Sequence, residues 1–166
     1  MKVIDVNTPI KLELTALGVK LLEESQQDIE ISEDNRVTMP IHKIIKTFGS
    51  HITFAQNEES PFYASAELPA EKLSFRTDCP AKVGLKKKGL EILNRLNADK
   101  MEAADERGTR AILYTFDDYG FITMPMAQIM LMFASSADEF AGNKAIHYAF
   151  NIEEKEFIPI ADTMQL

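Results

Sequence analysis

The chain repeats itself, and this internal repeat constrains the fold more than any other feature of the sequence. The segment Val37-Thr38-Met39-Pro40-Ile41 returns 85 positions later as Ile122-Thr123-Met124-Pro125-Met126. Upstream of it, five residues recur 71 positions later, in the pairs Lys11/Lys82, Leu14/Leu85, Gly18/Gly89, Leu21/Ile92 and Leu22/Leu93. A repeat in this order predicts two similar structural units.

Each copy has the pattern strand, helix, strand, helix, strand. In the first copy, residues 10–14 alternate apolar and polar side chains, as in a strand with one buried face. Thr15 then occupies the N-cap position of a helix, and Pro40 fits the first turn of a second helix. Gly18 and Gly89 lie inside predicted helices, where glycine costs about 1 kcal/mol relative to alanine, so we expect close packing there.

The predicted organisation is a first repeat over residues 1–68, a connector over 69–80 that is bounded by prolines, and a second repeat over 81–153. A C-terminal tail follows over 154–166. A unit of about 60 residues is marginally stable by itself, so the repeats are expected to pack as one domain. The fold class is therefore predicted as α+β, with the duplicated units related by a pseudo-two-fold axis.

The second copy is longer, with 14 additional residues between Lys100 and Phe121. Ala111 to Phe116 has strand character, and Asp117 to Gly120 supplies turn residues. This pattern predicts an inserted β-hairpin at about residues 101–121. The insertion mixes aromatic and acidic side chains, as contact surfaces between proteins do, and the predicted partner-binding residues are Tyr114, Phe116, Asp117, Asp118 and Tyr119.

The composition limits the classes of partner. With 26 acidic and 18 basic residues, the chain carries a formal net charge of −8, which disfavours direct binding to nucleic acid. Cys79 is a single cysteine, so an intrachain disulfide is excluded and a reducing compartment is expected. The first residues lack the apolar stretch of a signal peptide, and no run of 18 apolar residues occurs. We therefore expect a cytoplasmic protein that does not contact a membrane.

Catalytic motifs are scarce. His51-Ile52-Thr53 matches half of the site of a two-histidine phosphoesterase, but the second copy has no His-x-Thr to supply the other half. His51 and Thr53 are therefore only a candidate polar site, at the end of a predicted helix. No metal-ligand spacing and no phosphate-binding glycine loop occurs, so the sequence predicts no catalytic residues, no cofactor and no metal.

Residues 10–68 resemble a group of small bacteriophage proteins. The resemblance lies in the alternating strand, in Leu14-Thr15 followed by Gly18 and Leu21-Leu22, and in the segment Phe48-Gly49-Ser50-His51-Ile52. Residues 81–153 follow the same pattern more loosely, since Phe133-Ala134-Ser135 has no histidine after it. The resemblance implies expression in a bacterial host from a phage or prophage, and it implies no mechanism.

Three hypotheses of function follow. The first is a non-enzymatic interaction protein that binds a bacterial host protein, such as a component of an antiviral defence system. The second is a protein that binds or sequesters a small nucleotide-like ligand at the seam between the repeats. The third is a small hydrolase that uses His51. Self-association into a homo-oligomer stays open under each hypothesis.

Overall fold

The computed structural model describes residues 2–53, 55–136, 148–152 and 158–159. The first part of the chain forms β1 (Lys2–Asp5), β2 (Pro9–Leu14), α1 (Ala16–Glu24), β3 (Arg36–Pro40), α2 (Ile41–Phe48), the 3-10 turn η1 (Gly49–His51) and β4 (Phe62–Leu68). The second part forms β5 (Leu73–Arg76), β6 (Pro80–Leu85), α3 (Lys87–Arg107), β7 (Phe121–Pro125), α4 (Met126–Phe133), η2 (Ala134–Ser136), β8 (Tyr148–Ile152) and β9 (Ile158–Pro159). This mixture of helices and strands confirms the α+β class.

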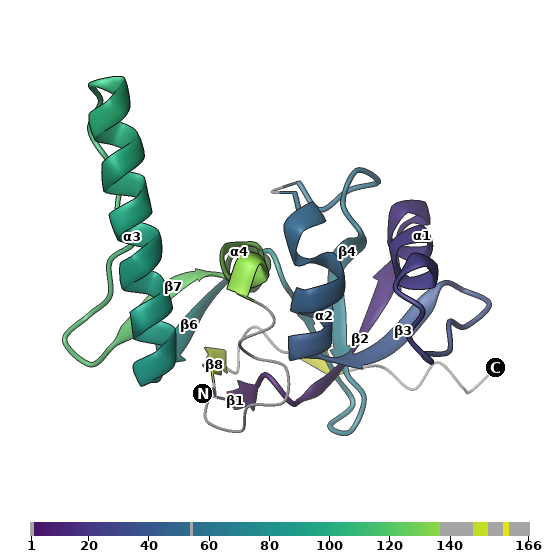
Figure 1. Ribbon diagram of the computed structural model, residues 1–166. Helices are drawn as coiled ribbons and strands as arrows, with labels where there is room; N and C mark the ends of the chain where they lie inside the picture. The colour runs from purple at the N-terminus through teal and green to yellow at the C-terminus, as the bar shows by residue number, and fades with distance from the viewer. Residues whose placement is uncertain (1, 54, 137–147, 153–157, 160–166) are drawn as a thin grey trace.

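The described strands form two antiparallel sheets (Figure 1). One sheet has the order β3-β2-β4-β5-β9, and the other has the order β1-β8-β6-β7. The hairpins of the two sheets pair matched positions of the repeat. Pro9 pairs with Pro40 in one hairpin, and Pro80 pairs with Pro125 in the other.

We call the segment from β1 to β4 the first half of the chain and the segment from β5 to β8 the second half. Backbone hydrogen bonds also recur at matched positions of the two halves. In each half, an N–H group at the start of the second helix donates to a carbonyl oxygen in the segment before the first hairpin strand. An N–H group at the end of that strand donates to a carbonyl oxygen in the turn before the second hairpin strand. The four bonds are His42 N–H to Val6 O (2.8 Å), Ala127 N–H to Thr77 O (3.0 Å), Leu14 N–H to Asn35 O (2.7 Å) and Leu85 N–H to Gly120 O (3.2 Å). Asn35 and Gly120 both have positive φ, at 58° and 80°, so the two turns share a left-handed residue.

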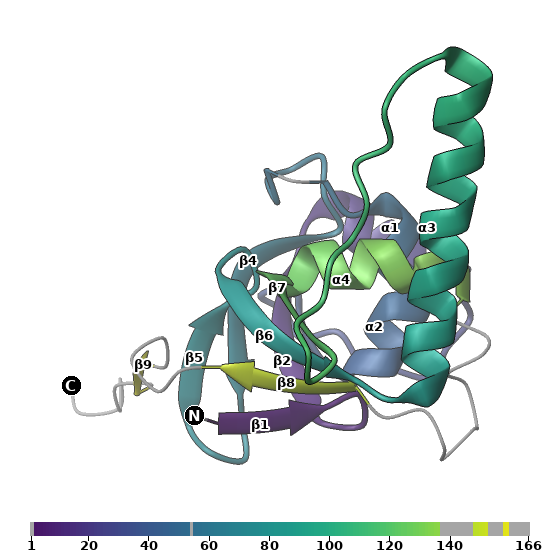
Figure 2. The ribbon, with the colours of Figure 1, turned by 90° about the vertical axis from the view of Figure 1, so that its left-hand side faces the viewer.

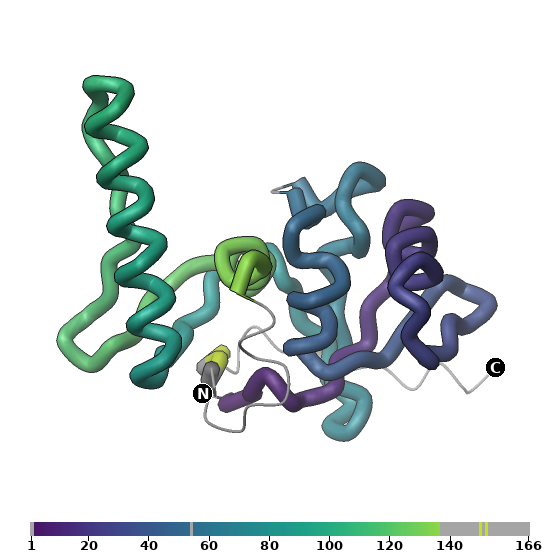
Figure 3. The backbone as a smooth tube through the Cα atoms, in the orientation of Figure 1, coloured from purple at the N-terminus to yellow at the C-terminus, as the bar shows by residue number. Residues whose placement is uncertain are grey.

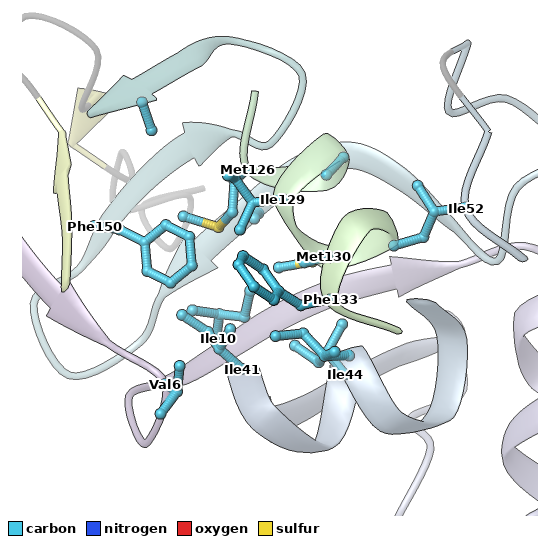
Figure 4. Close-up of a cluster of buried hydrophobic side chains, with 14 of the residues drawn as sticks. Val6, Ile10, Ile41, Ile44, Ile52, Met126, Ile129, Met130, Phe133 and Phe150 are labelled. Atoms are coloured by element: carbon cyan, nitrogen blue, oxygen red, sulfur yellow. The ribbon is translucent and has the colours of Figure 1, made fainter. Parts of the chain in front are cut away.

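The halves meet through their second helices. The α2–η1 segment packs against the α4–η2 segment, and side chains from both halves form one continuous hydrophobic core (Figure 4). Gly49 packs tightly against the other half, since a Cβ atom at this position would lie 2.7 Å from Cβ of Ala134. Gly49 and Ala134 are matched positions of the repeat.

Each half also gives its first strand to the sheet of the other half. β1 pairs with β8 at the edge of the second sheet, and β5 pairs with β4 in the first sheet. Neither strand was predicted from the sequence, and residues 69–80, which contain β5, were predicted to be a connector. Because of this exchange, neither half completes its sheet from its own residues.

The predicted β-hairpin at residues 101–121 is wrong. α3 continues to Arg107 and ends at Gly108, whose φ of 63° gives a left-handed C-cap. Residues 98–107 consist mainly of alanine, methionine and charged residues, and most of these side chains favour a helix. Residues 109–116 form no strand, and the chain re-enters the sheet at β7. The insertion therefore lengthens a helix and adds a segment that runs back toward the sheet, residues 109–116, which we call the return segment.

The prediction for the start of the first helix holds. The hydroxyl oxygen of Thr15 accepts a hydrogen bond from Gly18 N–H (3.2 Å), which confirms Thr15 as the N-cap of α1. Pro40 lies at the N-cap of α2, one position before the predicted first turn. Of the C-terminal tail at 154–166, the described residues are Ile158 and Pro159, which form β9 on the edge of β5.

Candidate functional site

The insertion forms an arm, which we define as residues 97–119. The first turns of α3 pack on the core through Ile92 and Leu93, which are fully buried, whereas Ala104 is the one buried residue of the helix beyond them. Figure 1 and the backbone tube in Figure 3 show the C-terminal part of α3 projecting away from the sheets, with the return segment beside it. The arm therefore contributes little to the core.

Two side chains of α3 hold the return segment. The amide of Asn97 forms two hydrogen bonds with the backbone of Tyr114, accepting from N–H and donating to the carbonyl oxygen, both at 2.9 Å. Lys100 donates to the carbonyl oxygen of Ile112 (3.2 Å), and its ammonium group lies 4.1 Å from the centre of the Tyr114 ring. These contacts fix residues 112–114 against the helix.

The turn at the base of the arm is built around Asp117. Its carboxylate accepts hydrogen bonds from the N–H groups of Tyr119 and Phe121, both at 2.9 Å, and its own N–H donates to the carbonyl oxygen of Phe121 (2.8 Å). Gly120 closes the turn with a positive φ. Asp117 was predicted as a contact residue, and the structure assigns its carboxylate a role within the turn.

The arm exposes several apolar side chains. Of the predicted contact residues, Tyr119 is 86% exposed and Phe116 is 44% exposed, Asp117 and Asp118 are exposed, and Tyr114 is half-buried. Three further exposed apolar residues of the arm were not predicted as contact residues, namely Ile112 (85% exposed), Met101 (51%) and Leu113 (39%). Ile112 and Leu113 belong to the run that was predicted to be a strand of a hairpin, and for this reason they were not predicted to be exposed.

The arm is acidic. It carries six carboxylates, at Asp99, Glu102, Asp105, Glu106, Asp117 and Asp118, and three basic residues, at Lys100, Arg107 and Arg110. Lys100 is occupied by the return segment. The arm therefore carries its exposed apolar side chains together with an excess of negative charge.

The second candidate site, His51 with Thr53, lies at the end of η1. His51 is exposed and Thr53 is half-buried, and the Thr53 backbone N–H donates to Oγ of Ser60 (3.4 Å). The hydroxyl oxygen of Thr53 is buried and has no hydrogen-bond partner within the described residues. His147, the histidine of the second repeat, lies outside the described residues.

A small cavity lies at the seam between the halves. It has a volume of about 40 Å³ and is lined by residues of both halves, namely Ile52, Thr53, Gln56, Asp78, Pro125, Ala127, Gln128 and Leu131. Ligand pockets in proteins have volumes of about 300–1,000 Å³, whereas a space of this size holds a water molecule or two. The Arg76 guanidinium donates to the carboxylate of Asp78 and holds the pKa of Asp78 below its ordinary value, so Asp78 is ionised and paired.

A larger groove of about 460 Å³ lies over the outer edge of the first sheet and is lined by Lys11, Asp28, Ile29, Glu30, Ser32, Arg36 and Thr38. Its size would accommodate a small ligand. The guanidinium of Arg36, however, already pairs with Asp34 (3.2 Å) and Glu67 (3.1 Å). Two further carboxylates line the groove, so its charge does not favour a phosphate group.

Within the described residues, no cluster of three or more histidine, cysteine, aspartate or glutamate side chains is arranged to hold a metal ion. None of the described helices has the length and apolar composition needed to cross a bilayer. Comparison of the chain with protein-family models, curated proteins and solved structures finds no match in any of the three.

Proposed function

We propose that this protein acts by binding another protein through its arm. The observation that carries the proposal is the group of exposed apolar side chains on an element that projects from the core, namely Met101, Ile112, Leu113, Phe116 and Tyr119. Single exposed apolar residues are ordinary on protein surfaces. On the arm, however, four exposed apolar residues lie within the eight consecutive residues 112–119. Exposed apolar residues that gather in one region mark contact surfaces between proteins.

The chemistry of the arm indicates the partner's surface. Aromatic side chains such as Phe116 and Tyr119 are the residues that most often contribute large binding energies when a partner buries them. The carboxylates around them would attract a basic surface and raise the rate of association at low salt. We therefore propose a partner with an apolar patch that is bordered by lysine and arginine residues.

The biological setting of the proposal comes from the sequence. The resemblance of residues 10–68 to small bacteriophage proteins supports a phage-encoded protein that acts in the bacterial cytoplasm on a host protein. Inhibition of an antiviral defence system would be one such action, because it requires a soluble binding protein and no catalysis. The small-ligand alternative has less support, because the seam cavity is too small for a nucleotide.

We also propose that the halves arose by duplication of one unit. Matched strand registers, matched backbone hydrogen bonds and the contact of Gly49 with Ala134 support this origin. The arm interrupts the correspondence between the halves. A segment that one copy has and the other lacks is a natural place for a function that the unit itself does not need.

The proposal is tested with a variant in which Ile112, Phe116 and Tyr119 are all replaced by serine. Affinity capture from bacterial lysate with the wild-type protein and with this variant, followed by mass spectrometry, identifies the proteins that depend on the arm. Val3→Ser is the matched control, because Val3 is 63% exposed and lies on β1, outside the arm. A purified candidate partner is then titrated against all three proteins.

We expect the triple variant to lose at least about tenfold in affinity, while Val3→Ser binds like the wild type. Binding should also weaken as the salt concentration rises from about 0.05 to 0.5 M, because the charges are exposed and screened. Circular dichroism and the melting temperature of the triple variant should match the wild type. Equal binding by the triple variant and the wild type would exclude the arm as the contact surface.

A further inference from the structure

The return segment of the arm resembles an edge strand with one edge occupied and one edge open. It covers the distance from the helix end at Gly108 back to Asn97, which is 11 residues of helix, or about 16 Å at 1.5 Å per residue. The chain makes this return within the six residues from Gly108 to Tyr114. At about 3.3 Å per residue an extended chain spans this distance, whereas a helix of six residues would span about 9 Å.

The hydrogen bonds to α3 fix the direction of each peptide group. Ile112 and Tyr114 direct their backbone polar groups toward the helix, where Lys100 and Asn97 bind them. In an extended chain, successive residues direct their N–H and C=O groups to opposite sides. The backbone groups of Leu113 and Thr115 therefore point away from α3. Within the described part of the chain, neither residue forms a backbone hydrogen bond.

An open edge of this kind is a liability in a soluble protein. Exposed edge strands pair with other chains, and proteins usually protect them with charges, prolines or bulges. Here Ile112, Leu113 and Thr115 are exposed and the segment contains neither proline nor a charge between Arg110 and Asp117. Figure 2 shows the segment descending beside α3 from the tip of the arm to β7, apart from both sheets over its upper part. The side chains alternate between two faces, so an added strand would contact Ile112 on one face and Leu113 on the other.

We propose that the arm recognises its partner by strand addition, in which an extended basic segment of the partner protein pairs with the open edge of residues 111–115. This inference rests on the proposed function and specifies its mode of recognition. Main-chain hydrogen bonds to Leu113 and Thr115 would provide affinity, and contacts with alternate side chains would provide specificity. The exposed carboxylate of Asp118 at one end of the edge and the net negative charge of the arm would favour lysine or arginine in the added strand.

The test compares Leu113→Pro with Leu113→Ala. Both variants remove the leucine side chain, but proline also removes the outward N–H and blocks pairing at the edge. The probe is a fluorescein-labelled decapeptide of alternating lysine and valine, titrated by fluorescence anisotropy up to about 1 mM protein. A decapeptide of alternating glutamate and valine tests the charge preference, and a lysine–valine peptide that is N-methylated at every second residue tests the main-chain contact.

Strand addition predicts that the lysine–valine peptide binds the wild type, that Leu113→Ala weakens binding less than threefold, and that Leu113→Pro weakens it by about tenfold or more. The glutamate–valine and N-methylated peptides should bind at least about tenfold more weakly. Because the N–H of Leu113 has no partner within the described residues, Leu113→Pro should keep the wild-type melting temperature.

The outcomes separate the mode of recognition from the proposed function. Equal affinities for Leu113→Pro and Leu113→Ala, or no binding of the lysine–valine peptide, would overturn strand addition. The proposed function would still stand if the triple serine variant loses its captured partner. A wild-type dimer in analytical ultracentrifugation that Leu113→Pro converts to a monomer would assign the edge to a second copy of this chain, and would overturn the choice of a basic partner.

Discussion

Gly18 lies in α1, where helix propensity and packing make opposite predictions for its replacement by alanine. Propensity alone predicts that Gly18→Ala stabilises the helix by about 1 kcal/mol. In the structure, however, a Cβ atom at this position would lie 1.9 Å from the carbonyl oxygen of Pro61. Backbone atoms cannot rotate away as a flexible side chain does, so the segment containing Pro61 would have to move by more than 1 Å.

The cost can be worked from the contacts of that segment. Thr15, which is 2% exposed, donates its backbone N–H to Pro61 O (3.0 Å) and its hydroxyl to Ser60 O. Displacing Pro61 would disturb these buried hydrogen bonds, at about 1–3 kcal/mol, and overpacking costs about 1–3 kcal/mol more. After the gain in propensity is subtracted, we expect Gly18→Ala to lower the free energy of unfolding by about 3 kcal/mol.

Urea denaturation followed by circular dichroism measures this difference, and a thermal melt should show a decrease of about 6–12 °C for a chain of this size. Glu23→Ala is the matched control, because Glu23 is exposed on the same helix and alanine has a similar propensity. Its midpoint should stay close to that of the wild type. If Gly18→Ala were as stable as the wild type or more stable, the close approach of α1 to Pro61 would be refuted.

Three further predictions concern the seam, a histidine and the arm. Gly49→Ala should destabilise the protein by about 1–2 kcal/mol through crowding against Ala134, and adding Ala134→Gly should recover part of the loss; a double-mutant cycle with no coupling would contradict the contact. Burial lowers the pKa of His42 below its ordinary 6.5, so the unfolded chain takes up a proton first, and stability should fall as the pH decreases below about 6.5. His42→Gln should reduce this fall in urea midpoints measured between pH 7.5 and 5.5, and an unchanged fall would remove His42 as its cause. Asn97→Ala should speed amide hydrogen exchange at Tyr114 at least about tenfold without a comparable change in the core, whereas equal exchange would show that Asn97 does not hold the return segment.

The elements that local patterns specify could be predicted from the sequence. Thr15, Gly18 and Pro40 each act through neighbours within a few residues or through close packing, and their roles follow from hydroxyl, glycine and proline chemistry. The exchange of β1 and β5 could not be predicted in this way. Lys2–Asp5 is too short to show a clear alternation, and its partner β8 lies about 150 residues further along the chain. Pairing over such a separation is decided by the packing of the whole fold.

The error at the insertion has a similar origin. Ala111 to Phe116 has the composition of a strand, and the segment is extended, but its hydrogen-bond partners are side chains of α3 and not a second strand. Strand propensity predicts the extended conformation, but it does not identify the groups that form hydrogen bonds with the backbone. Phe116 and Tyr119 were predicted as contact residues because they are aromatic residues of the insertion, and both are exposed. The exposed Met101 was not predicted, because residue 101 was not recognised as part of a projecting helix.

The distribution of apolar residues separates stability from function in this chain. Residues that recur in both halves, such as Phe48 and Phe133, are fully buried and meet in the shared core. The arm belongs to the second half alone, and Ala104 is its one buried residue. Its exposed side chains at Ile112, Phe116 and Tyr119 therefore stabilise little of the fold, yet they carry the cost of apolar surface in water. Stability does not explain why they are apolar, whereas the burial by a partner that we propose would explain it.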